Sequence, residues 1–210
     1  MSAPILIDLC CGRGGWTKGA QAEGYRAIGF DLSQDFERVY PGEFVCGDVR
    51  VLMRDVLDRE RPSKYRDLIR QAALICASPP CEEFSRHQMP WTKRRNPPEP
   101  DLSVVEACRK IAAATGRPMV LENVRMAQRW LGRARWHTGP FYLWGDVPAI
   151  MPRLEFGSDR HDASSPAIRQ KQTMSSSRRA ERAEVPFELA RHVSAVFKPA
   201  ASDYKRGLSS

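Results

Sequence analysis

Short apolar runs separated by charged, helix-forming stretches recur along the chain. The runs lie at residues 5–9, 25–31, 43–46, 72–77 and 118–124. Apolar runs of this length are typical of buried strands. Strands that are separated by helical crossovers form a mostly parallel sheet. The pattern therefore predicts an α/β fold with a doubly wound, mostly parallel sheet.

The remaining elements follow from helical periodicity and from the positions of proline. Proline in a helix interior removes a hydrogen bond and clashes with the preceding turn, so the charged stretch 51–71 is expected to break near Pro62. A further strand is expected at 141–144. Helices are expected over 14–23, 51–71, 102–115 and 181–197, the last with Pro186 near its first turn.

The chain length of 210 residues predicts one domain. We expect this domain to span residues 1–197 and to be followed by a tail, 198–210. The polar, serine-rich composition of 157–177 indicates a flexible loop. Residues 90–100 are too rich in proline for a helix or strand and indicate a long loop.

Composition limits the class of protein. No segment reaches the length of a membrane span, and we expect a cytoplasmic protein without a membrane partner. The six cysteines are expected to be thiols, and no metal site is expected because none of them forms a Cys-x-x-Cys pair. The net charge of +8 fits a polyanionic partner such as a nucleic acid.

One apolar run leads into a turn that presents a cysteine. The run 72–77 is followed directly by Ser78-Pro79-Pro80-Cys81, and two consecutive prolines allow neither strand nor helix to continue. The turn delivers Cys81 to the carboxyl edge of the sheet, where open α/β folds place their chemistry. A lone cysteine is usually an inert core residue. Behind a rigid elbow that includes Pro80, Cys81 becomes a candidate nucleophile.

Two other segments complete a recognisable set. Residues 5–9 lead into the glycine turn of residues 10–16 (CCGRGGW), a nucleotide-binding shape, and the run 118–124 contains Glu122-Asn123-Val124. In this order, the glycine turn, the Pro-Cys element and the Glu-Asn-Val triplet resemble the DNA cytosine-5 methyltransferase family. The resemblance covers residues 3–137 well. It implies the Rossmann-like class I fold of S-adenosylmethionine-dependent methyltransferases.

The resemblance implies an S-adenosylmethionine site at the glycine turn. The N-terminus of the following helix offers free N–H groups and a positive dipole end, which suit a carboxylate. Asp31, at the end of the second strand, can hold ribose hydroxyls through its carboxylate. Asp48, after the third strand, can accept from an adenine amino group. Helix capping is the alternative for both of these acids. The implied cofactor residues are Asp8, Cys10, Gly12, Gly14, Gly15, Trp16, Asp31 and Asp48.

The implied chemistry explains why a thiol and an acid are paired. Carbon 5 of cytosine is a poor nucleophile, and a thiolate that adds to carbon 6 raises the electron density at carbon 5. The family gives this role to the residue matching Cys81. Glu122 matches the acid that stabilises charge at N3, and Asn123 would hold the turn beside it. Arg133 and Arg135 resemble the family's Arg-x-Arg element, whose second arginine contacts the base carbonyl.

The implied partner is DNA with a flipped cytosine, because Cys81 cannot reach a base inside a duplex. Ser85 falls where the family's mobile loop enters DNA. Glu82 stands where the family usually has Gln, and a carboxylate is unfavourable beside phosphates. The residues expected to contact nucleic acid are Ser85, Lys93, Arg94, Arg95 and Arg133.

A second departure concerns specificity. Family members usually carry a large target-recognition domain between the Arg-x-Arg element and the final helix, whereas this chain has a short, loop-like segment there. We therefore expect little sequence preference, or a partner that supplies it. The alternatives are the same chemistry on RNA, such as transfer RNA, or on a cytosine nucleotide, and a non-catalytic nucleic-acid-binding relative.

Overall fold

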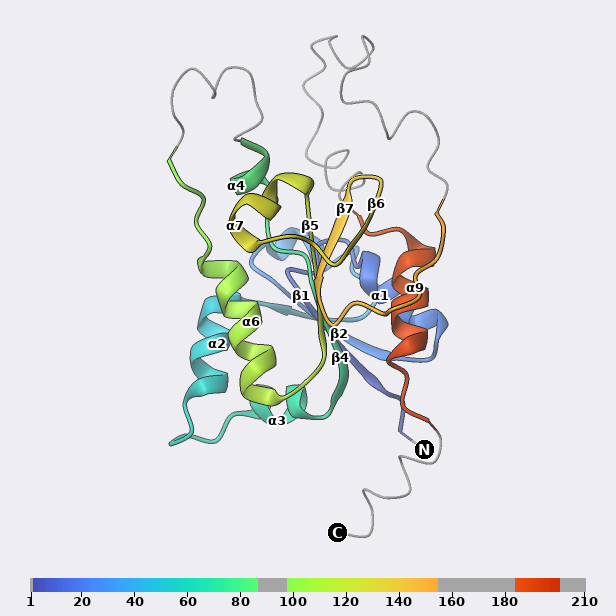
Figure 1. The fold of residues 1–210 in the computed structure, drawn as a ribbon. Coiled ribbons are helices and arrows are strands. Elements are labelled where there is room, and N and C mark those ends of the chain that lie inside the picture. Colours follow the sequence, from blue (N-terminus) through green and yellow to red (C-terminus); the bar gives the residue numbers. More distant parts are fainter. Residues whose placement is uncertain (1, 87–97, 155–183, 201–210) are drawn as a thin grey trace.

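The computed structural model describes residues 2–86, 98–154 and 184–200. Figure 1 shows one central sheet with helices on both of its faces. Within the described ranges, no helix has both the length and the apolar character needed to cross a bilayer. Several predictions lie outside the described residues: the loop 157–177, the basic residues Lys93, Arg94 and Arg95, and the tail beyond residue 200.

Within these residues the sheet has seven strands, in the order β3-β2-β1-β4-β5-β7-β6. Neighbours among β1 to β5 are parallel, and β7 is antiparallel to β5 and β6. This order, with β7 reversed, is that of the Rossmann-like class I methyltransferase fold and confirms the expected fold class. The strands are β1 (Ile5–Leu9), β2 (Arg26–Asp31), β3 (Glu43–Cys46), β4 (Ala72–Ala77), β5 (Met119–Asn123), β6 (Trp136–Thr138) and β7 (Phe141–Gly145).

The helices form a layer on each face of the sheet (Figure 1). The longer α-helices are α1 (Gly15–Ala22), α2 (Val49–Leu57), α3 (Lys64–Arg70), α6 (Ser103–Thr115) and α9 (Phe187–Val196). The short elements are η1 (Gln34–Phe36), α4 (Glu82–Ser85), η3 (Arg125–Ala127) and α7 (Gln128–Leu131). The expected break near Pro62 separates α2 from α3, and the Ser63 hydroxyl caps α3 by accepting from the N–H of Arg66 at 3.0 Å.

Both faces of the sheet are buried, which explains the nearly continuous apolar runs in the sequence. Alternate residues of β1 belong to different cores: Ile7 packs on the side of α2 and α6, and Leu6 packs on the side of α1 and α9. Both side chains are fully buried. The central strands are therefore rigid supports for the loops at their ends.

The C-terminal helix α9 packs directly against α1. A Cβ added at Gly19 of α1 would lie 2.3 Å from the backbone nitrogen of Arg191, and one at Gly15 would lie 2.7 Å from that of Val185. Only glycine permits such a close approach of two backbones. The Tyr25 hydroxyl also donates to the carbonyl of Ser194 at 2.9 Å. The last helix thus supports the segment that follows the glycine turn.

Candidate active site

The three segments selected from the sequence begin side by side at the carboxyl edge of the sheet, the upper end in Figure 1. In the sheet register, Leu9 lies beside Ala77, and Ala77 lies beside Leu121. The residues that follow these three positions start the glycine turn, the Ser78–Cys81 elbow and the Glu122-Asn123 pair. Parallel strands that end level therefore bring together segments that are far apart in the sequence.

The elbow that carries Cys81 is fixed to β5 by a hydrogen bond. The side-chain amide nitrogen of Asn123 donates to the carbonyl oxygen of Pro79 at 2.9 Å, and Asn123 is only 1% exposed. Its amide oxygen accepts from the backbone N–H of Val124 at 2.9 Å. Because a buried polar group left without its partner costs free energy, this amide determines where the elbow lies.

The thiol of Cys81 is half-buried at the start of α4, next to the exposed Pro80. Burial, together with the charges of Glu82 and Glu122, raises its pKa from 9.0 to about 11. A hydrogen bond from the side chain of Ser85 opposes this rise. Ser85 therefore lies against the thiol, and its expected contact with nucleic acid stays a prediction. Since the thiolate is the nucleophile, the thiol must lose its proton when it attacks.

Glu122 lies buried beside the elbow, with 8% of its surface exposed. Burial of the carboxyl away from water raises the pKa of Glu122 from 4.5 to about 7. A hydrogen bond from the side chain of Ser78 opposes the rise. Both protonation states are then populated near neutral pH. An acid with a pKa near the working pH is well suited to donate a proton to a group that gains negative charge during a reaction.

A chain of hydrogen bonds connects the first helix to this acid. The indole N–H of Trp16, which is 2% exposed, donates to the hydroxyl oxygen of Ser78 at 3.0 Å. An indole nitrogen can only donate, so the hydroxyl hydrogen of Ser78 remains free to bond Glu122. Ser78 was not predicted from the sequence to have a role. The signal that could have found it is a hydroxyl residue between an apolar strand and two prolines.

The glycine turn adopts a backbone conformation that most side chains disfavour. Gly12 and Gly14 have φ angles of 50° and 78°, in the left-handed region that glycine enters at little cost. Cys10 has a φ of 56°, which is uncommon for a residue with a side chain. A Cβ added at Gly12 would meet no atom within 4 Å. The outer side of the turn therefore has room for a ligand.

Asp31, at the end of β2, closes the turn and keeps acceptor capacity. One carboxylate oxygen accepts from the N–H of Gly12 at 2.9 Å, and the other accepts from the N–H of Ser33 at 3.0 Å. Each carboxylate oxygen has two lone pairs, and the side chain is half-exposed, so both oxygens can accept a further bond. This carboxylate fits the two hydroxyls of a ribose, as the S-adenosylmethionine prediction requires.

The carboxylate of Asp48 caps α2, which is the alternative that the sequence left open. It accepts from the backbone N–H of Arg50 at 2.8 Å and from the guanidinium of the same residue at 2.7 Å. Asp48 and Gly47 also line a cavity of about 440 Å³. Contact between Asp48 and an adenine amino group stays a prediction, and Arg50 would compete for the same oxygens.

Asp8 lies beneath the glycine turn and is 1% exposed. One oxygen of its carboxyl accepts from the Thr17 hydroxyl at 2.9 Å, and the other has no hydrogen-bond partner among the described residues. Burial raises its pKa from 3.8 to about 8. The carboxyl is thus mostly protonated at neutral pH and supports the turn from below, and its contact with a cofactor stays a prediction.

Arg133 and Arg135 lie between α7 and β6 with exposed side chains. The backbone N–H of Arg135 donates to the carbonyl of Leu143 at 2.9 Å, which leads the chain into β6. Among the described residues, neither guanidinium forms an ion pair, and neither hydrogen-bonds Cys81 or Glu122. The role of Arg135 as a base clamp stays a prediction.

Comparisons with known proteins give structural likeness only. No protein-family model and no curated protein match the sequence. The structure is similar to that of an Entamoeba histolytica methyltransferase, EhMeth, with 17% identity over 63% of this chain and a TM-score of 0.41. It is similar to PH0226 protein from Pyrococcus horikoshii OT3, with 15% identity over 64% of this chain and a TM-score of 0.39.

A third similar structure is the S. pombe Dnmt2 methyltransferase, with 13% identity over 61% of this chain and a TM-score of 0.37. The matched regions span only 41%, 57% and 36% of the three proteins, in the order given. The fold assignment therefore rests on the strand order of this chain. What the chain does is inferred from the geometry of its own site.

Proposed function

We propose that this protein transfers a methyl group from S-adenosylmethionine to carbon 5 of cytosine in DNA, through a covalent adduct with Cys81. The observation that carries the proposal is the pairing of a presented thiol with a buried acid at adjacent strand ends. The side-chain amide of Asn123 on β5 holds the elbow of Cys81 by donating to the Pro79 carbonyl at 2.9 Å. The residue before Asn123 is Glu122. A purely structural cysteine needs no such acid beside it.

Cys81 would act first. Its thiol gives its proton to a water molecule, and the resulting thiolate adds to carbon 6 of the cytosine ring. A carbon–sulfur bond forms as the ring electrons move toward carbon 5 and N3. Glu122, protonated in part at neutral pH because its pKa is about 7, donates to N3 where the charge accumulates. Burial of the carboxyl strengthens this interaction, because water does not compete for it.

Cofactor binding would fall to the glycine turn and Asp31. When bound, S-adenosylmethionine supplies an electrophilic methyl group. Asp31 offers two free acceptor sites, and the turn at Gly12 is open on its outer side. Once carbon 5 carries the methyl group, its proton passes to a water molecule and the carbon–sulfur bond breaks. Glu122 takes the N3 proton back and Cys81 leaves as the thiolate, so the free enzyme and a 5-methylcytosine within the DNA remain.

The experiment that tests this function identifies the modified nucleoside. The purified protein is incubated with methyl-labelled S-adenosylmethionine and with duplex DNA, single-stranded DNA or RNA of matched sequence, and the digested products are separated. Labelled 5-methylcytosine from DNA is the expected result. Label only in 5-methylcytidine from RNA would transfer the chemistry to the RNA alternative, and label on another base or no label would contradict the proposal.

Two variants separate chemistry from folding in the same assay. Cys81→Ser should abolish turnover, since a hydroxyl is far less nucleophilic than a thiolate at neutral pH. Glu122→Gln keeps the size of the side chain but cannot release a proton to N3, and turnover should fall by about a hundredfold or more. Both variants should bind S-adenosylmethionine as the wild type does, because neither residue is placed at the glycine turn.

A further inference from the structure

The segment that follows Asn123 forms a basic surface. From Arg125 to Gly145 the chain contains four arginines and one histidine, and no aspartate or glutamate. All five basic side chains are exposed. We refer to Arg125, Arg129, Arg133, Arg135 and His137 as the basic strip.

The charges of the basic strip are free to meet an anion. Within the described residues, none of its four arginines forms an ion pair, whereas Arg26 and Arg50 are both held by carboxylates. The guanidinium of Arg129 lies 5.1 Å from the ring centre of Trp130, a contact that orients it without neutralising it. Binding a phosphate here would break no existing salt bridge.

An aromatic pair lies at the end of the strip. His137 and Tyr142 are directly opposite one another on β6 and β7. Their rings are stacked, with centroids 4.7 Å apart and planes 10° from parallel. Tyr142 covers one face of the imidazole, and the His137 side chain is exposed. Stacking on an aromatic ring beside arginines is a common way of holding unpaired bases.

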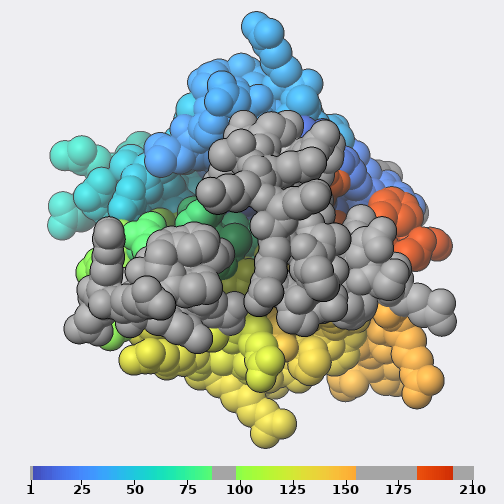
Figure 2. Space-filling view, turned by 90° about the horizontal axis from the view of Figure 1, so that it is seen from above, coloured from blue at the N-terminus to red at the C-terminus, as the bar shows by residue number. Residues whose placement is uncertain are grey.

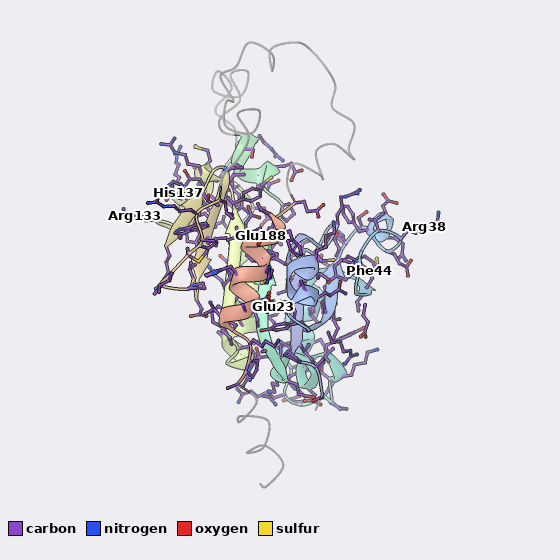
Figure 3. All side chains as sticks on the ribbon, turned by 90° about the vertical axis from the view of Figure 1, so that its right-hand side faces the viewer. Glu23, Arg38, Phe44, Arg133, His137 and Glu188 are labelled. Carbon is purple, nitrogen blue, oxygen red and sulfur yellow. The ribbon has the colours of Figure 1, made fainter. Side chains whose placement is uncertain are left out.

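This surface starts at the candidate active site. Asn123 lies opposite Tyr142, and Tyr142 lies opposite His137, so the three residues form one row across β5, β7 and β6. Two strand spacings place His137 about 10 Å from Asn123. Figure 3 shows Arg133 and His137 on the same side of the molecule, away from Arg38. In the view of Figure 2 the yellow segment that contains α7 and β6 forms one edge of the upper face.

We propose that the basic strip and the His137–Tyr142 pair bind an unpaired stretch of nucleic acid adjacent to the target base. Arg125, Arg129 and Arg133 contact the backbone phosphates, and His137 stacks on a base. This inference rests on the proposed function for the position of the target base, but binding is measured without turnover. It supplies a holding surface beside the target base.

The charge of the strip is tested by binding of labelled oligonucleotides in a salt series, followed by fluorescence anisotropy. The triple variant Arg125→Ala/Arg129→Ala/Arg133→Ala should bind single strands more weakly, and its log–log salt slope should be smaller by about 2, because each lost phosphate contact removes about 0.7. Arg59→Ala/Arg70→Ala/Arg117→Ala is the matched control. It makes the same change in net charge with exposed arginines near the opposite end of the strands.

The control variant should keep the wild-type slope. Equal losses in both variants would show that only net charge matters, and a wild-type slope in the strip variant would show that the strip makes no contact. Either result would overturn the proposal. Single-stranded DNA and single-stranded RNA of one sequence, run side by side, show which backbone the strip prefers.

The stacking contact is tested separately at His137. His137→Ala should weaken binding to single strands by about tenfold, the usual effect of losing one base–aromatic contact. His137→Phe retains a ring and should bind nearly as tightly as wild type. Both changes should have little effect on a fully paired duplex, whose bases are not available for stacking. Equal affinity of the alanine and phenylalanine variants for single strands would contradict a stacking role.

The outcome is distinguishable from that of the proposed function. The catalytically inactive Cys81→Ser protein should show the full binding pattern, since Cys81 is not in the strip. Binding that depends on the strip without methyl transfer would refute the proposed function and leave this inference standing. Methyl transfer by a strip variant that binds nucleic acid as tightly as wild type would refute this inference and leave the proposed function standing.

Discussion

The indole N–H of Trp16 donates to the hydroxyl of Ser78 at 3.0 Å, and Ser78 in turn bonds the carboxyl of Glu122. The helix that follows the glycine turn is thereby connected to the proposed acid. Ser78 stabilises the charged form of Glu122, so it holds the pKa of that carboxyl lower than burial alone would. Ser78 is a positioning residue in this account, because it acts through Glu122.

The substitution Ser78→Ala should raise the pKa of Glu122 above its value of about 7. The buried carboxylate would lose a donor, and a buried charge without a hydrogen bond is disfavoured. The measurement is the carboxyl carbon chemical shift of labelled glutamate against pH in the free protein. Ser85→Ala is the matched control, because Ser85 bonds Cys81 and should leave the Glu122 midpoint unchanged. An unchanged midpoint in Ser78→Ala would remove Ser78 from the account.

Replacement of Asn123 by alanine should affect both folding and chemistry. The carbonyl of Pro79 would lose its donor in a buried position, which costs about 1–3 kcal/mol of unfolding free energy. The elbow would also lose its fixed position, so turnover should fall more than the stability loss explains. Urea unfolding and single-turnover rates measure the two effects. Gln71→Ala is the control: it removes an exposed hydrogen bond from the side-chain amide of Gln71 to the carbonyl of Asp67, and it should have little effect on stability or on turnover.

Glu82 is expected to suppress the reactivity of the neighbouring thiol. Its charge contributes to the raised pKa of Cys81, so Glu82→Gln should lower that pKa from about 11. The rate of alkylation of Cys81 by iodoacetamide, followed against pH, should then rise at lower pH than in wild type. Glu83→Gln is the matched control, since Glu83 pairs with Arg86 and is not among the charges that raise this pKa. Identical alkylation profiles for Glu82→Gln and wild type would contradict the assignment.

Asp8 should make stability fall as pH rises. Its carboxyl has a pKa of about 8 in the folded protein because it is buried, against an ordinary value of 3.8. Between these values the folded protein holds a proton that the unfolded chain has released. The contribution of this group to the unfolding free energy is therefore complete below about pH 4 and is lost as the pH rises to about 8.

The variant Asp8→Asn tests this dependence, because it resembles the protonated acid and cannot ionise. Its unfolding free energy should depend less on pH between 5 and 8 than that of wild type, as measured by urea unfolding at both values. Asp67→Asn, at an exposed acid of α3, should retain the wild-type dependence. Equal pH slopes for Asp8→Asn and wild type would show that Asp8 is ionised in the folded protein.

The sequence predicted the central sheet closely, because its strands are buried on both faces. The bounds expected for β1, β3 and β4 are those observed, and the break near Pro62 was found where proline forbids a helix interior. The expected strand at 141–144 is confirmed as β7. The short elements β6 and α7 were not expected, since three or four residues carry too little periodicity to be recognised.

The site was predicted less completely, because its contacts join distant segments. The elbow of Cys81 and the acid Glu122 were selected from local patterns, and the level ends of β4 and β5 place them side by side. The bond from Trp16 to Ser78 spans 62 positions and has no local signal. Asp48 differs, because its capping of α2 is a local contact that the sequence offered as the alternative to ligand binding.

Attack of Cys81 on carbon 6 of cytosine can be tested by trapping with 5-fluorocytosine. A fluorine at carbon 5 cannot leave as a proton does, so the covalent intermediate should accumulate. With S-adenosylmethionine present, peptide mass spectrometry should find an oligonucleotide adduct on the peptide that contains Cys81, and none with Cys81→Ser. Production of 5-methylcytosine from normal DNA together with no adduct, or with an adduct on another cysteine, would contradict the account.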